Sequence, residues 1–136
     1  PGKRPRATLT PAMAIKNGEP FVSFAVQGGD TQDQNLLQFF LNMVEFDMNV
    51  QEAAEAPNIN SYQMYSSFGS HSKEAGRIVV QEDTPPWVKK DLRKMGYNVV
   101  TRPLTSGPIN AIWFDRVHGT MWGGSSNHGE DYGIGW

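Results

Sequence analysis

The sequence predicts an α+β fold with a mostly antiparallel sheet, because strands, then helices, then further strands follow one another along the chain. Apolar runs joined by turn residues stand near the start, and helical periodicity dominates the middle. At 136 residues the chain fits one domain, so we treat residues 1–136 as a single domain.

The first element expected is a hairpin. Apolar runs at 12–15 and 21–26 flank Asn17-Gly18, and this pair is a strong signal for a tight turn because both residues tolerate positive φ. Later strands are expected at residues 77–82, 97–101, 109–116 and 121–123.

Two helices should follow the first hairpin. Apolar residues surround most of the segment 33–47, which predicts a helix buried on most sides. Asn49 is suited to cap a second helix over 50–56, and Pro57 should end it because the residue before proline avoids the helical region. The first helix keeps one narrow polar stripe, made of Gln38, Asn42 and Glu45.

The second half of the chain begins without a readable period. Residues 58–76 are polar and mixed, so we expect a long loop there. Thr84-Pro85 is a good helix start, since proline suits the first helical position, and the helix should end at Met95 with Gly96 left-handed behind it.

Charge and composition exclude several classes of partner and site. A net charge of -2 gives no footprint for nucleic acid, and no apolar run approaches the roughly 20 residues of a membrane span, so neither partner is expected. The absence of cysteine excludes disulfides and thiolate metal sites but leaves the compartment open. We expect no metal and no cofactor, because three histidines stand far apart with no i, i+4 partner: His71, His118 and His128.

Two kinds of residue carry candidate chemistry. Gly28 and Gly29 join a strand to a helix, where their backbone N–H groups are suited to hold an oxyanion; the alternative is a tight structural turn with Asp30 as the helix cap. Thr8 and Thr10 carry hydroxyls that either bind a substrate carboxylate or satisfy local backbone. No Gly-x-Ser-x-Gly elbow or phosphate loop is present.

Several segments resemble gamma-glutamyltransferases in order and spacing. Residues 3–11 are similar to the family's Lys-Arg-Pro-Leu-Ser-Ser-Met-Ser-Pro, and residues 25–30 stand where the family has Gly-Ser-Pro-Gly-Gly-Ser. Residues 46–57 resemble its Tyr-Gly-(apolar)-Asn-(apolar)-x-Glu-Ala-x-x-Ala-Pro helix pair, and residues 124–136 its Gly-Ala-Ser-Asp-Pro-Arg ending, although Asn127-His128-Gly129 replaces Asp-Pro-Arg. The resemblance covers essentially the whole chain, as the C-terminal part of the small subunit.

The resemblance implies an αββα sandwich of the N-terminal nucleophile hydrolase type, in which a threonine exposed by self-cleavage attacks a gamma-glutamyl amide. It implies that Gly28 and Gly29 form the oxyanion hole and that Thr8 contacts the substrate's α-carboxylate. The family's neighbouring serine is Ala7 here, which removes a hydroxyl donor and brings a related amide acylase, of the cephalosporin acylase kind, into consideration.

The same resemblance places the nucleophile upstream of Pro1, so we expect this chain to be inactive alone. Its implied partners are a gamma-glutamyl compound or related amide, together with the rest of the small subunit and the large subunit. An exposed sheet edge should also favour self-association. A non-enzymatic binding domain that reuses the fold stays open as a further alternative.

Overall fold

The computed structural model describes residues 1–4, 7–105, 107–128 and 133, and it contains two sheets. The larger is antiparallel, in the order β1-β2-β6-β7: Ala12–Lys16, Glu19–Val26, Ile109–Asp115 and Thr120–Ser125. The smaller has the order β3-β4-β5: Ile59–Ser61, Arg77–Gln81 and Asn98–Arg102. The helices are α1 (Gln32–Val44), α2 (Val50–Glu55) and α3 (Pro86–Lys94). The predicted α+β class with mostly antiparallel pairing is confirmed.

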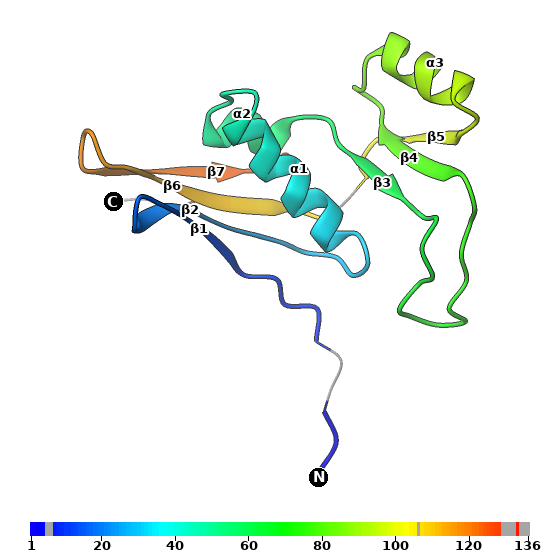
Figure 1. Ribbon diagram of the computed structural model, residues 1–136, viewed down its shortest axis with the longest axis horizontal. Helices are drawn as coiled ribbons and strands as arrows, with labels where there is room; N and C mark the ends of the chain where they lie inside the picture. The colour runs from blue at the N-terminus through cyan, green and yellow to red at the C-terminus, as the bar shows by residue number, and fades with distance from the viewer. Residues whose placement is uncertain (5–6, 106, 129–132, 134–136) are drawn as a thin grey trace.

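One strand pair departs from antiparallel order. β4 and β5 run parallel, which requires a crossover, and α3 supplies it. In Figure 1 α3 lies beside these two strands, away from the larger sheet. The helix begins at Pro86, later than expected, but Met95 is its C-cap and Gly96 has a φ of 93° as its left-handed end.

The main core lies between one face of the larger sheet and the pair α1 and α2 (Figure 1). Phe24 on β2 packs between two rings of α1, with centroid distances of 5.2 Å to Phe39 and 6.0 Å to Phe40. The remaining buried members of this core are Val22, Val26, Met43, Val50, Ala53, Ala54, Ile109 and Ala111.

Local turn and cap predictions agree with the structure. Asn17 and Gly18 both have positive φ between β1 and β2. Asn49 caps α2 in a full capping box, accepting from the backbone of Gln51 and Glu52 while the Glu52 side chain accepts from the Asn49 N–H.

The environment of α1 differs from the prediction. The helix is not buried on most sides: Leu37 is 57% exposed, and Leu41 and Val44 are exposed as well. Its inward positions include polar Gln32 and Asn35, because this face of the helix reaches backbone and amide groups instead of an apolar surface. Apolar content alone therefore did not identify the buried face.

The predicted loop at 58–76 contains a strand, β3, whose free edge is closed by side chains. Gln34 donates to the Ser61 carbonyl at 3.1 Å and accepts from its N–H at 2.7 Å. Gln38 does the same with Ile59, both distances being 2.8 Å. Two glutamine amides on α1 thus replace a neighbouring strand, so the predicted polar stripe does not simply face solvent.

No helix in the described part of the chain is long and apolar enough to cross a membrane.

The turn between β6 and β7 depends on Asp115. Its buried carboxylate accepts from the Val117 N–H at 3.0 Å, the His118 N–H at 3.2 Å and His118 Nδ1 at 2.6 Å. The hydrogen bond from the His118 side chain is the main cause that lowers the pKa of Asp115, and burial opposes it.

Replacing Asn49 by alanine should lower the free energy of unfolding by about 1 kcal/mol, because its side chain satisfies N–H groups at the start of α2. Asn49→Ser keeps a capping oxygen and should restore most of this stability. Urea denaturation of the three proteins measures the effect, and equal midpoints for wild type and Asn49→Ala would show that the cap contributes nothing.

Stability should also fall in acid because of Asp115. The pKa of Asp115 is lower in the folded protein than in the unfolded chain. The resulting stabilisation is therefore complete at pH values above about 3.9, the pKa of an unfolded aspartate, and it disappears as the pH falls through the folded pKa. Asp115→Asn should remove this part of the pH dependence, and His118→Ala should reduce it. Urea midpoints from pH 2 to 6 measure the change, and parallel curves for wild type and Asp115→Asn would contradict the assignment.

Candidate functional site

The two predicted glycines lie in the turn from β2 to α1. The Gln27 N–H donates to the Pro108 carbonyl at 3.2 Å, and the Gln32 N–H donates to the Gly29 carbonyl at 3.1 Å. The N–H groups of Gly28 and Gly29 donate to no atom of the described residues. Two consecutive uncommitted donors therefore stand at the N-terminus of α1.

The interpretation of Asp30 as the helix cap is wrong. Thr31 occupies the N-cap position and makes no side-chain cap hydrogen bond. Asp30 Oδ2 instead accepts from the Ser67 N–H at 2.7 Å, which holds the β3–β4 loop against the turn. The carboxylate serves this long-range contact because the loop brings an N–H within its reach.

Each glycine is needed for a different reason. Gly28 has a φ of 146°, a conformation in which any side chain is strained. A Cβ on Gly29 would stand 2.9 Å from Phe68 Cε2, closer than van der Waals contact allows. Phe68 from the β3–β4 loop thus covers Gly29, a contact that no feature of the sequence indicates.

A groove of about 600 Å³ brings Thr8 and Gly28 together, whereas Gly29 is not part of its wall. None of the described residues that line the groove is charged. They are Thr8, Leu9, Thr10, Pro11, Ala25, Val26, Gln27, Gly28, Pro108 and Asn110.

The two candidate threonines have different environments. The Thr10 hydroxyl donates to the Val26 carbonyl at 3.3 Å and accepts from Gln32 Nε2 at 3.2 Å, so it satisfies local groups. The Thr8 hydroxyl makes no hydrogen bond within the described residues, and only its carbonyl is engaged, by Gln32 Nε2 at 2.7 Å. Of the two hydroxyls, only that of Thr8 is not engaged by the described residues.

The whole chain, residues 1–136, matches the family model described as gamma-glutamyltranspeptidase. The chain belongs to the gamma-glutamyltranspeptidase family. A glutathione hydrolase proenzyme from Bacillus subtilis (strain 168) is 31% identical over 136 residues, covering 98% of this chain and 21% of that protein. An acylase ACY 1 proenzyme from Pseudomonas sp. (strain V22) is 31% identical over 123 residues, covering 90% of this chain and 20% of that protein.

Solved structures confirm the predicted N-terminal nucleophile hydrolase fold. The T380A mutant of Helicobacter pylori gamma-glutamyltranspeptidase aligns with a TM-score of 0.74 at 26% identity, over 93% of this chain and 63% of that one. This chain spans about a fifth of the length of the two curated relatives. The chain therefore corresponds to one part of these longer family members, as the sequence predicted.

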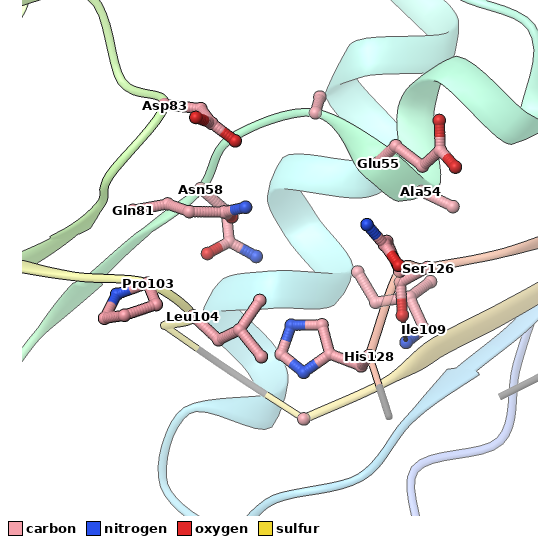
Figure 2. Close-up of a pocket in the computed structure, with 13 residues that line it drawn as sticks. Ala54, Glu55, Asn58, Gln81, Asp83, Pro103, Leu104, Ile109, Ser126 and His128 are labelled. Atoms are coloured by element: carbon pink, nitrogen blue, oxygen red, sulfur yellow. Dashed lines mark hydrogen bonds between the residues drawn. The ribbon is translucent and has the colours of Figure 1, made fainter. Parts of the chain in front are cut away.

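A second cavity, of about 390 Å³, is lined in part by Gly107 and Ile109 (Figure 2). Figure 2 shows Asn58, Gln81 and Asp83 on one side of it and Glu55 and Ser126 on the other. His128, weighed earlier as a metal ligand, also lines it. Within the described ranges no three His, Asp or Glu side chains lie close enough to hold a metal ion.

Sequence reasoning missed one buried residue at the groove. Gln32 is 4% exposed and stands at the first position of α1. Gln32 is the first of four consecutive polar residues that open α1, and glutamine is common on solvent-facing helix positions, so nothing in the sequence singled it out. Its contacts become visible only when the N-terminal segment lies beside the end of β2.

Proposed function

We propose that this chain supplies the oxyanion donors and part of the acyl-binding groove of an enzyme that transfers or hydrolyses gamma-glutamyl groups. The observation that supports this most is a set of three donors with no partner among the described residues: the Thr8 hydroxyl and the Gly28 N–H at the groove, and the adjacent Gly29 N–H. A site with unpaired donors is suited to anionic groups on its ligand.

Acyl transfer from a gamma-glutamyl amide gives each of these donors a separate task. When a nucleophile attacks an amide carbonyl, negative charge develops on the oxygen, and consecutive N–H groups stabilise it best where they are already oriented. The N-terminus of α1 adds a favourable dipole. Thr8 would donate to the substrate's α-carboxylate, a few bonds from the reacting carbon.

The nucleophile is proposed to be a threonine elsewhere in the parent protein, exposed by self-processing. The relatives named above are proenzymes, and this chain spans about a fifth of them. Without that threonine no acyl-enzyme forms, so the segment alone should release no aniline from a gamma-glutamyl anilide.

We also propose that the rest of the parent protein covers the apolar outer face of the larger sheet. Cross-strand pairing places Met13, Ile112 and Met121 on the face of the larger sheet that points away from α1, and all three are exposed. A second sheet would cover this face in an αββα sandwich. β1, with one partner strand, keeps an open edge for pairing or self-association.

An amide acylase is the second candidate, and the groove itself favours it. Ala7 offers no hydroxyl beside Thr8, and the described lining lacks a cation to pair with an α-carboxylate. One lost hydrogen bond to a carboxylate is worth about 1.5 to 3 kcal/mol, enough to alter substrate preference without preventing acyl transfer.

Adding a methyl group at the glycines tests the oxyanion role. Gly28→Ala and Gly29→Ala in the parent enzyme should each slow acylation by about 100-fold to 1000-fold by displacing an N–H donor. Because Gly29→Ala also crowds Phe68, the matched control is Gly29→Ala combined with Phe68→Ala. Pre-steady-state acylation measures the rates. Folded variants with full rates would make the turn purely structural, and recovery only in the double variant would assign the Gly29 effect to crowding.

Substrate preference tests Thr8. Thr8→Ala should lower kcat/KM for a gamma-glutamyl anilide about 10-fold to 100-fold more than for a 4-aminobutyryl anilide, which lacks the α-carboxylate. Ala7→Ser should shift the ratio in the opposite direction. Equal losses on both substrates would mean that Thr8 is structural, and an unchanged ratio in Ala7→Ser as well would favour the acylase.

A further inference from the structure

Gln32 connects the N-terminal segment, which carries Thr8, to the end of β2, which leads into the turn with Gly28 and Gly29. Its Nε2 lies 2.7 Å from the Thr8 carbonyl, 3.0 Å from the Val26 carbonyl and 3.2 Å from Thr10 Oγ1. One amide nitrogen therefore contacts both the N-terminal segment and the last residue of β2, directly before the glycine turn.

We propose that Gln32 is a positioning residue, which fixes the Thr8 hydroxyl relative to the Gly28 and Gly29 N–H groups. The inference rests on the proposed function for its catalytic consequence, but the fixing itself is a property of the fold. Gln32 contacts the groove residues through the carbonyls of Thr8 and Val26 and the hydroxyl of Thr10, and it engages none of the three donors.

Burial makes this contact difficult to replace. Gln32 is 4% exposed and Val26 is 6% exposed, so water has little access to the Val26 carbonyl if the amide is removed. Among the described residues ahead of β1, the other hydrogen bond from this segment to β2 is made by the Thr10 hydroxyl, and its distance of 3.3 Å to the Val26 carbonyl is long. Loss of Gln32 should let Thr8 shift, and a displacement of about 1 Å at a positioned group is enough to cost on the order of 100-fold in rate.

The same helix provides a control of identical chemistry. Gln38 also lies on α1 and also bonds backbone groups through its side-chain amide, but its partner is Ile59 on β3, outside the groove. Gln32→Met and Gln38→Met each remove one amide of equal size from a helix-to-backbone contact. They differ in which segment they release.

The first experiment is independent of activity. Leu9 is 83% exposed, so a protease that cleaves before leucine, thermolysin, reports how firmly the segment around Thr8 is held in the intact protein. Gln32→Met should raise the rate of cleavage at Leu9 by at least 10-fold over wild type, and Gln38→Met should not. Equal cleavage rates in both variants would overturn the positioning role.

The second experiment asks whether Gln32 acts through Thr8. In the parent enzyme, Gln32→Met should reduce the preference for gamma-glutamyl over 4-aminobutyryl anilide about 10-fold, and should add little in a Thr8→Ala background because the two changes remove one function. Additive effects, or an equal change in Gln38→Met, would overturn the inference. If wild type acylates with neither anilide, the proposed function fails, while the cleavage experiment still decides the role of Gln32.

A third variant covers the case in which Gln32→Met does not fold. Gln32→Glu keeps the size of the side chain but loses both N–H donors when ionised. The preference for the gamma-glutamyl anilide should be low at high pH and rise as the new carboxyl becomes protonated and donates again. A preference that does not vary with pH beyond that of wild type would contradict the role.

Discussion

The amide side chains on the first two turns of α1 determine how the two sheets meet. Gln34 and Gln38 bond the backbone of β3, the side chain of Asn60 donates to Asn35 Oδ1 at 2.8 Å, and Gln32 reaches the end of β2. An apolar contact would allow α1 to slide by fractions of a turn, because hydrophobic burial is non-directional. Hydrogen bonds to specific carbonyl and N–H groups fix the register, and the geometry of the groove follows from it.

The parts of the fold that were predictable from the sequence are those set by local chemistry. Asn17-Gly18 and Asn49 act through their own backbone or through residues within one helical turn, so a single sequence contains the information. β3 was missed for the opposite reason. It has three residues, its partner strand is β4, and two side chains of α1 replace its second partner. The burial of α1 was overestimated because its apolar residues do not indicate which surface covers them.

The candidate site shows the same division. The unusual backbone conformation at Gly28 was predictable from residue type, and its φ is 146°. The reason for Gly29 lies in Phe68, which comes from a distant loop and has no local signature. Thr8 and Thr10 are alike in the sequence, and only the packing of β2 and Gln32 against them decides which hydroxyl is engaged. Residue type indicated the chemistry, whereas tertiary contacts assigned it to positions.

The groove becomes suited to an anion through the pairing of its acceptors. The carbonyls of Thr8 and Val26 are both acceptors at the groove, and left unpaired they would oppose negative charge on a ligand. Gln32 and the Thr10 hydroxyl occupy these carbonyls from the protein side. The donors of Gly28, Gly29 and Thr8 have no such partners among the described residues, so the local balance favours donors although the described lining contains no cation. Electrostatic selectivity for the oxyanion that we propose can thus arise in a groove whose described lining is uncharged, because the carbonyls of Thr8 and Val26 are paired within the fold and oriented N–H groups remain.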